Sequence, residues 1–327
     1  MSGAGLKGSA LLPSPWSQDT VFRMAGAMLL PGFSAHVAKI RGARTRYYVG
    51  GAGEPLILVH GLGGAAVNFS ELAPLLARRN KVLIPDLPGH AGSRPLAEVQ
   101  DLTSYSEHVA AVAEREEMLP AAVVGYSLGA VVALRLAVSR PEAVRGLVLV
   151  AAAGIVSATR RAEIYLGVMG ALRPARAMAY FRHLFARRPR LRHLPFAVWG
   201  AEHSPALSPR SVLGFLEGVP SHTDTGSAGR VLVADDPRPD LDRVRCPTIL
   251  LWGARDRLVP LADGFEYARR LRAPIRTLPA ARHLLVGEQP AACAAVIDEF
   301  LDGIGKVDEL PLEAELIGEL RRQRADA

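Results

Sequence analysis

The chain has 327 residues, of which 49% are hydrophobic and 22% charged, and its net charge is +7. This length favours one core that carries an insertion over two independent domains, and the composition excludes a disordered or fibrous protein. The two cysteines, Cys246 and Cys293, exclude a disulfide framework, and because neither has the spacing of a metal ligand we expect no metal site.

The first 34 residues are interpreted as an N-terminal extension. They are rich in Ser, Gly and Pro to about position 20 and then carry an apolar stretch at 21–30. This stretch is shorter than the roughly 20 residues needed to span a bilayer, and the features of a signal peptide are not all present. We expect a cytoplasmic protein whose apolar stretch packs on the protein itself, with docking on a membrane surface as the alternative.

Short apolar runs alternate with helical patterns along most of the chain. The predicted strands cover 36–40, 45–49, 55–59, 81–84, 121–124, 146–150, 247–252 and 275–278. The predicted helices cover 68–79, 103–119, 128–139, 263–271 and 291–301. The first two strands flank Arg41-Gly42, which indicates a hairpin, and the later continuous apolar runs are typical of strands buried on both faces. The order predicts an α/β fold, a mostly parallel central sheet with helices on both faces.

Residues 155–240 break this alternation. They contain no buried-strand run, and their helix-like patches are interrupted by prolines. Because open α/β sheets bind ligands at the carboxyl edge of their strands, we interpret the segment as a helical cap or lid over that edge. The predicted domains are the extension 1–34, a core in two parts at 35–154 and 241–303, the cap 155–240, and a charged C-terminal helix within 304–327.

Positive charge is concentrated in this predicted cap. Nine arginines and a single acid, Glu163, lie between Arg160 and Arg192, so this segment alone accounts for the net charge of the chain. Such a patch suits anionic lipid headgroups, an acidic substrate or nucleic acid. No nucleic-acid-binding motif accompanies it, so we expect no nucleic-acid partner. Peripheral membrane contact and an arginine-rich surface without a partner both stay open.

The segment Gly125-Tyr126-Ser127-Leu128-Gly129 joins a predicted strand to a predicted helix. In this setting the pattern Gly-x-Ser-x-Gly predicts a nucleophile elbow. The abrupt reversal forces Ser127 into a strained backbone conformation and leaves room only for small residues two positions away. The start of the following helix then favours a developing negative charge beside the serine. Ser127 is therefore the predicted nucleophile.

A serine nucleophile needs a base, and the base needs an orienting acid. At such an elbow the chain order is Ser, then Asp or Glu, then His. Asp256 follows strand 247–252 and His283 follows strand 275–278, which places both at the same sheet edge as Ser127. Alone, the first could be a loop carboxylate paired with a neighbouring arginine and the second a solvated histidine. Their order and position together predict a catalytic triad.

Two backbone N–H groups should stabilise the oxyanion that forms in such a reaction. One is that of Leu128, directly after the nucleophile. The other is expected from the loop His60-Gly61-Leu62-Gly63-Gly64, whose glycines allow close approach to a substrate. We choose the N–H of Leu62 and expect its side chain to face the acyl group. The residues expected to contact substrate are Gly61, Gly63 and Tyr126.

Taken together, four motifs resemble the α/β-hydrolase superfamily: the His60–Gly64 loop, the segment Asp86–Arg94, the elbow, and the loops of Asp256 and His283. The chain looks most like its bacterial lipases and monoacylglycerol-lipase-like esterases. The resemblance extends over roughly 37–301 and implies a structural role for Asp86–Arg94. A serine nucleophile argues against haloalkane dehalogenases and epoxide hydrolases, and Leu284 after the histidine argues against meta-cleavage hydrolases. Arg282 stands where such families usually have glycine.

The predicted activity is hydrolysis of a carboxylic ester through an acyl-enzyme, without a cofactor. The aliphatic loop residues and the apolar and basic segments favour an apolar acyl chain, such as that of a glycerolipid. A thioesterase, an acyltransferase or a cofactor-free perhydrolase on the same triad stays open, as does a ligand-binding protein without activity.

Overall fold

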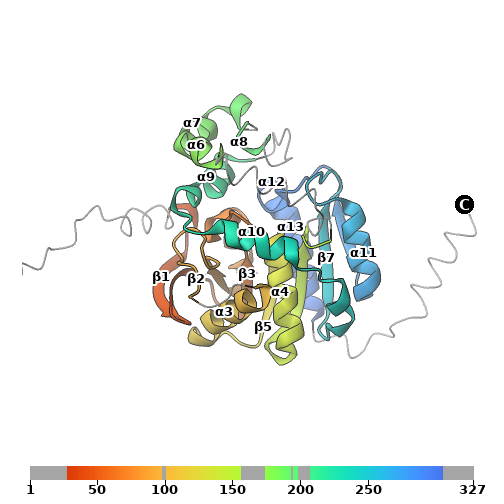
Figure 1. The fold of residues 1–327 in the computed structure, drawn as a ribbon. Helices are drawn as coiled ribbons and strands as arrows, with labels where there is room; N and C mark the ends of the chain where they lie inside the picture. The colour runs from red at the N-terminus through yellow and green to blue at the C-terminus, as the bar shows by residue number, and fades with distance from the viewer. Residues whose placement is uncertain (1–27, 98–100, 156–173, 193, 198–206, 305–327) are drawn as a thin grey trace, which may run out of the picture.

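A single mixed sheet forms the centre of the molecule in a computed structural model that describes residues 28–97, 101–155, 174–192, 194–197 and 207–304. The strands are β1 (Phe33–Ile40), β2 (Ala43–Gly50), β3 (Glu54–Val59), β4 (Asn80–Pro85), β5 (Ala121–Tyr126), β6 (Val144–Val150), β7 (Thr248–Gly253) and β8 (Ile275–Leu278). Their order is β1-β2-β4-β3-β5-β6-β7-β8 (Figure 1). The six strands β3 to β8 are parallel to one another. Strand β2 pairs antiparallel with both β1 and β4. All eight predicted strands and the mostly parallel sheet are confirmed.

The predicted hairpin joins β1 and β2. Both of its turn residues have positive φ, 45° at Arg41 and 78° at Gly42. A two-residue turn of this kind has the twist that suits the flanking strands. The strands β3 to β7 each contain a buried apolar run, and in β3 the run Leu56–Val59 has no exposed surface. The loops that carry the predicted site residues follow strands of this sheet.

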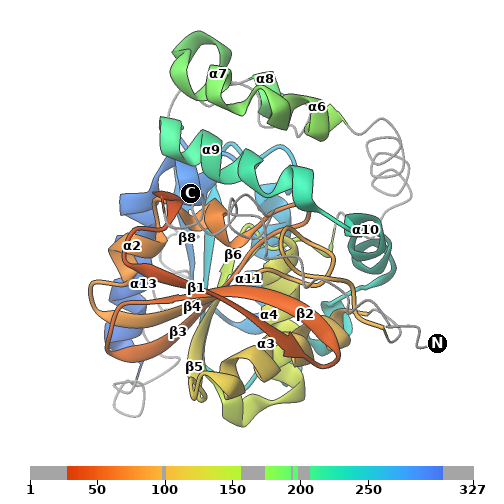
Figure 2. The same cartoon turned by 90° about the vertical axis from the view of Figure 1, so that its left-hand side faces the viewer.

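Helices cover both faces of the sheet. They are α2 (Ala73–Leu76), α3 (Leu102–Arg115), α4 (Leu128–Ser139), α11 (Leu261–Leu271), α12 (Leu285–Glu288) and α13 (Pro290–Gly303), with short 3₁₀ turns η1 (Ala66–Phe69) and η2 (Pro141–Ala143). Helices α3, α4 and α11 lie on one face, and α2 and α13 lie on the other (Figures 1 and 2). This arrangement confirms the predicted α/β architecture.

Two predicted helices differ in extent. The helix expected at 68–79 is divided into η1 and α2, because Pro74 has no N–H to continue a helix and begins a new turn instead. The helix expected at 103–119 ends at Arg115, and Glu117 then adopts φ 53°, which no α-helix contains.

Between β6 and β7 the described residues contain helices and no strand. They form α6 (Pro174–Tyr180), α7 (Arg182–Arg187), η3 (Pro189–Leu191), α8 (Leu194–Ala197), α9 (Pro209–Glu217), η4 (Val219–Ser221), α10 (Thr225–Ala234) and η5 (Arg238–Arg243). We call the described residues between 174 and 240 the cap segment. Helices α6 to α8 form its outer layer, and α9 lies between them and the sheet (Figure 2). The division of the chain at 155 and 240 stays a prediction.

The cap segment has a small hydrophobic cluster of its own. Phe185, Phe196, Val212 and Leu216 are buried in it, and Leu284 from the core joins them. Burying a large aliphatic or aromatic side chain stabilises a fold by about 1.5–3 kcal/mol, so the cluster fastens the cap segment to the loop that follows β8.

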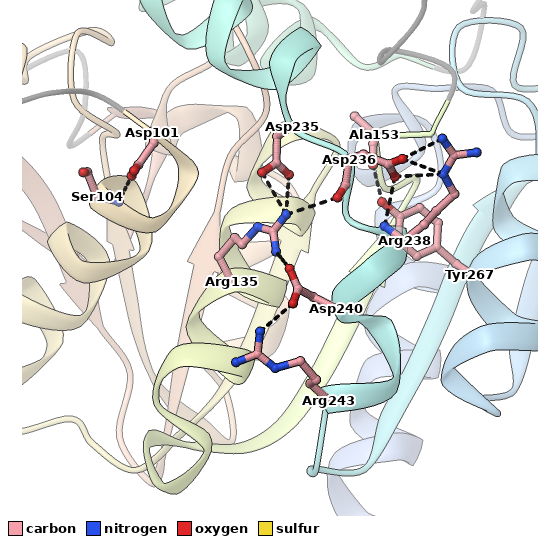
Figure 3. Close-up of polar contacts among 10 residues, drawn as sticks. All are labelled: Asp101, Ser104, Arg135, Ala153, Asp235, Asp236, Arg238, Asp240, Arg243 and Tyr267. Carbon is pink, nitrogen blue, oxygen red and sulfur yellow. Dashed lines mark hydrogen bonds and ion pairs between the residues drawn. The ribbon is translucent and has the colours of Figure 1, made fainter.

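Polar contacts hold the chain just after β6 and fasten the end of the cap segment to the core (Figure 3). The hydroxyl of Tyr267 on α11 donates to the carbonyl of Ala153, just after β6. At the other end Arg135 on α4 forms ion pairs with Asp235 and Asp240. The chain is therefore held at Ala153 and again at the end of the cap segment.

The predictions for the first 27 residues and for the C-terminal helix lie outside the described residues. Among the residues that the structure describes, no helix combines the length and the apolar character needed to cross a membrane.

Candidate active site

Ser127 occupies a sharp turn between β5 and α4. Its φ of 55° and ψ of −116° lie in a region that side chains other than glycine rarely adopt. Hydrogen bonds on both sides hold it there: its N–H donates to Val150 O at 2.9 Å, and its carbonyl accepts from Ala130 N at 3.0 Å. The strain expected at an elbow is therefore present, and neighbouring backbone stabilises it.

The two glycines of the motif are required by close backbone packing. A Cβ on Gly125 would lie 2.3 Å from Gly129 O and 2.4 Å from the Cα of Ala130. A Cβ on Gly129 would lie 2.1 Å from Val59 O. Atoms cannot approach this closely, so the reversal at Ser127 depends on glycine at both positions.

Three side chains from separate loops meet at the carboxyl edge of the sheet. His283 Nε2 lies 3.2 Å from Ser127 Oγ, and His283 Nδ1 lies 2.8 Å from Asp256 Oδ2. All three residues are buried. Asp256 follows β7 and His283 follows β8, as the sequence predicts. The structure thus brings the three predicted residues into one chain of hydrogen bonds.

The second carboxylate oxygen of Asp256 is also engaged. Asp256 Oδ1 accepts from the backbone N–H groups of Leu258 and Val259, each at 2.9 Å. With one oxygen held by the loop, the other has a fixed direction toward the imidazole of His283. This arrangement favours the tautomer with the proton on Nδ1, which leaves Nε2 free to accept a proton from Ser127.

Tyr126 lies beside the histidine. The two ring centroids are 5.3 Å apart, and the tyrosine ring is also near Gly61, where an added Cβ would lie 3.5 Å from its Cδ1. Burial, together with Asp256 and Glu288, raises the pKa of Tyr126 well above its usual value, so its hydroxyl stays protonated. Its predicted contact with substrate stays a prediction.

The loop after β3 approaches the serine closely. A Cβ on Gly61 would lie 3.1 Å from Ser127 Cβ, so only glycine fits there easily. The carbonyl of Gly61 accepts from Gly64 N at 3.0 Å and lies 2.9 Å from His60 Nδ1. In a trans peptide the N–H points opposite to the C=O, so the N–H of Leu62 points away from these partners.

Helix α4 supplies the second predicted donor. Leu128 is its first residue, and the first N–H groups of an α-helix have no partner within the helix. Leu128 directly follows Ser127, and the partial positive charge at a helix start favours an anion there. The N–H of Leu62 lies in the loop after β3 and that of Leu128 at the start of α4, and their role as oxyanion donors stays a prediction.

His60 is a structural residue in this arrangement. Its Nε2 accepts from Leu87 N at 3.0 Å, so Nδ1 carries the proton and donates to Gly61 O. Burial is the main cause that lowers its pKa, which keeps the ring neutral. His60 thereby joins the loop after β3 to the loop after β4.

Two further buried groups, Asn68 and Asp86, stabilise the loop after β3. Asn68 Oδ1 accepts from Ala65 N, and its Nδ2 donates to Gly214 O in α9, both at 3.0 Å. Asp86 Oδ1 accepts from Ala66 N at 2.8 Å while its other oxygen pairs with Arg46. Asp86 lies in the segment for which the resemblance implied a structural role, whereas nothing in the local pattern marked Asn68.

Neither cysteine takes part in the hydrogen bonds that join Ser127, His283 and Asp256. Cys293 is buried in α13, where burial raises the pKa of its thiol to about 12. Burial likewise raises the pKa of Cys246 to about 11. Across the described ranges, no three side chains of His, Cys, Asp and Glu are grouped as a metal site would need.

Residues 56–296 match the alpha/beta hydrolase family. The chain belongs to this family. It is 28% identical, over 81% of its length and the whole of the relative, to the pimeloyl-[acyl-carrier protein] methyl ester esterase of Neisseria meningitidis serogroup C. It is 31% identical, over 80% of its length and 67% of the relative, to the dihydrolipoyllysine-residue acetyltransferase component of the acetoin cleaving system of Pseudomonas putida.

Solved structures share the fold. A membrane phospholipase A matches with a TM-score of 0.63 at 24% identity and covers 88% of this chain and 89% of its own. A lipase from Acinetobacter baumannii matches with a TM-score of 0.66 at 20% identity and covers 91% and 99%. The expected superfamily is therefore confirmed, and its relatives include esterases and lipases.

Proposed function

We propose that the chain is a serine hydrolase that cleaves carboxylic esters with an apolar acyl chain. The observation that carries the proposal is the chain of hydrogen bonds from Asp256 through His283 to Ser127, with the serine held at φ 55°. A serine in this arrangement is activated by the adjacent base, and the strained turn holds its hydroxyl at the carboxyl edge of the sheet.

In the proposed reaction Ser127 Oγ attacks the ester carbonyl carbon while its proton passes to His283 Nε2. The resulting oxyanion accepts hydrogen bonds from the N–H groups of Leu62 and Leu128. The tetrahedral intermediate collapses, the C–O bond to the alcohol breaks, and His283 donates its proton to the leaving alkoxide. Water then attacks the acyl-enzyme, its proton passes to His283, and the acid leaves as Ser127 regains a proton.

The apolar surroundings support an apolar acyl group. The side chain of Leu62 faces α10 of the cap segment, since a Cβ added to Gly229 would lie 3.7 Å from Leu62 Cδ2. Leu284, next to the base, packs into the hydrophobic cluster of the cap segment. Substrate groups that enter between these elements would leave water for an aliphatic environment, which favours alkyl chains.

The test compares the wild-type protein with S127A on p-nitrophenyl esters from acetate to decanoate. We expect S127A to lose about 10⁴-fold or more in kcat, because the nucleophile and its base act as a unit. S139A, at the far end of α4, is the matched control and should keep wild-type turnover. Unchanged turnover in S127A would refute the assignment, and a preference confined to acetate would refute the apolar acyl group.

Transfer to another acceptor is separated by product analysis. Relatives of this chain include an acetyltransferase component, so the ester assay is repeated with an added alcohol or thiol. Free acid as the main product supports hydrolysis, and an acylated acceptor as the main product supports an acyltransferase instead.

We also infer peripheral contact between the cap segment and anionic lipid. Tyr180 at the end of α6, Phe181 between the two helices and Leu184 on α7 are 79%, 51% and 46% exposed. Arg187 and Arg188, close by in sequence, are exposed as well. Aromatic and aliphatic groups beside arginines suit the headgroup region of an anionic membrane.

Vesicle flotation tests this contact. The wild-type protein should float with phosphatidylglycerol-containing vesicles and less with pure phosphatidylcholine, and F181S/L184S should reduce flotation severalfold. Equal recovery with both vesicle types, or no effect of the double substitution, would contradict the inference.

A further inference from the structure

His222 connects the cap segment to two loops at the sheet edge. It lies between η4 and α10, and its Nδ1 accepts from Ala91 N at 2.9 Å. Because Nδ1 is the acceptor, the neutral ring carries its proton on Nε2 and donates it to Gly63 O at 2.8 Å. One side chain thus links the loop after β4 to the glycine loop after β3.

The carbonyl that His222 holds belongs to a peptide with a second hydrogen bond. The Gly63–Gly64 peptide is trans, so its N–H points opposite to the carbonyl, and this N–H donates to Gly61 O at 3.0 Å. Gly61 O in turn belongs to the peptide that carries the N–H of Leu62. The bond from His222 therefore fixes one peptide plane, and that plane fixes the next.

Such a bond is needed because the loop is rich in glycine. Gly63 has φ 67°, a conformation that glycine adopts at little cost, and glycine peptides have several orientations of similar energy. Without the donor from His222, the Gly63–Gly64 peptide can rotate and release Gly61 O. The peptide that carries the N–H of Leu62 would then be held only by the bond that Gly61 O accepts from His60 Nδ1, so its direction would be less tightly fixed.

The surroundings of His222 hold it in place. The ring of His90 packs against it at 5.6 Å, and burial, aided by the two flanking histidines, lowers the pKa of His90 well below its usual value. The backbone N–H groups of Thr223 and Asp224 both donate to Gly89 O, at 2.9 and 3.0 Å. This part of the cap segment is therefore anchored independently of the bond to Gly63.

We propose that His222 is a positioning residue that orients the oxyanion donor of Leu62 through the Gly63–Gly64 peptide. Although it lies in the cap segment and touches no reacting atom, it determines how well the loop after β3 stabilises the transition state. The inference rests on the proposed function, since the direction of the Leu62 N–H matters only if an oxyanion forms at Ser127.

A matched pair of substitutions separates the two bonds of His222. In H222N the side-chain oxygen takes the place of Nδ1 and keeps the bond from Ala91, but the side chain is too short to reach Gly63 O. In H222Q the terminal amide takes the place of Nε2 and can still donate to Gly63 O. We expect H222N to lower kcat about tenfold with little change in KM, less than the 10²–10³-fold effect of deleting a donor itself. H222Q should stay within about threefold of wild type.

A second measurement reports on the oxyanion directly. A trifluoromethyl ketone with an alkyl chain adds to the serine and forms an oxyanion, so its Ki should rise in H222N by the same factor as kcat falls. T223A is the control: it removes hydroxyl contacts to Gly89 O and Ser93 O but leaves the Gly63 bond. It should keep wild-type kcat and Ki.

The outcomes are distinct. Wild-type kcat and Ki in H222N, equal loss in T223A, or H222Q as impaired as H222N would each overturn the inference while the ester hydrolase stands. A wild-type protein that neither turns over esters nor binds the ketone would refute the proposed function and this inference with it. If H222N fails to fold by circular dichroism, H222A provides the test, and wild-type kcat in H222A overturns the inference.

Discussion

At the scale of single residues, we expect Asp256 to determine which nitrogen of His283 carries the proton. Its Oδ1 is held by two backbone N–H groups and its Oδ2 faces His283 Nδ1. In D256N the amide oxygen keeps the backbone bonds, so the NH₂ group faces the ring. Nδ1 must then accept, the proton moves to Nε2, and the base cannot take the proton of Ser127. We expect kcat to fall about 10³–10⁴-fold at pH 7, measured with a p-nitrophenyl ester.

The control for this substitution is D302N, which changes an exposed carboxylate paired with Arg79. Its kcat should equal that of the wild type. If D256N retained more than a tenth of wild-type kcat, Asp256 would not be the residue that orients the base.

Gly125 provides a residue-scale prediction for stability. A methyl group there overlaps backbone atoms of α4, and overpacking of this kind typically costs 1–3 kcal/mol. We expect G125A to lower the melting temperature by about 5 °C, followed by circular dichroism. G226A is the matched control, because a Cβ on that helical glycine meets nothing closer than 3.5 Å. An equal melting temperature for G125A and wild type would contradict the packing described for the elbow.

At the scale of elements, the end of α10 and the turn η5 are fastened to α4 by Arg135. This side chain is 11% exposed, and its two partners, Asp235 and Asp240, are 21% and 24% exposed. R135M removes the guanidinium group, so the half-buried carboxylates of Asp235 and Asp240 lose their shared positive partner. We expect a loss of about 2 kcal/mol in unfolding free energy, reduced from the buried-pair value by solvent screening. Proteolytic cleavage between 235 and 243 should also become faster.

Arg238, an exposed arginine nearby, provides the comparison for the effect of Arg135 on stability. R238M removes an ion pair with Asp236 at the surface, and such pairs contribute about 0–1 kcal/mol. R135M should therefore be the more destabilised of the two in urea unfolding. Equal stability of both variants would show that Arg135 does not fasten the cap segment.

The elements of the core were predictable from local patterns, whereas their contacts with the cap segment were not. Ser127, Asp256 and His283 each follow a strand of the parallel part of the sheet, and the carboxyl ends of parallel strands meet at one edge, so their proximity follows from the order of elements. Neither His222 nor Asn68 directly follows a predicted strand, so the order of elements does not indicate their partners. His222 is 159 positions from Gly63, and Asn68 is 146 positions from Gly214. Pairings of this range depend on how helices α9 and α10 pack, and no local periodicity encodes that packing.

At the scale of the whole molecule, buried neutral histidines make stability depend on pH. His108 on α3 packs against β2, where its Nε2 lies 2.9 Å from Thr45 Oγ1. Burial, with a smaller contribution from Arg41, lowers its pKa to about 4 from the ordinary value of 6.5. The unfolded chain therefore binds a proton at a pH where the folded chain does not. The stability that this histidine contributes is complete above pH 6.5 and is lost as the pH falls toward 4.

Replacing this histidine should make the molecule less sensitive to acid. Between pH 7 and pH 5 the unfolding free energy of the wild type should fall more than that of H108Q, by up to about 2 kcal/mol for a single group of this pKa. Urea unfolding at the two pH values measures the difference. H36Q, on the edge strand β1, is the control and should follow the wild type. The same fall in H108Q and in wild type would mean that His108 is not protonated on unfolding in this range, and that other groups, such as His60 and His90, account for the sensitivity to acid.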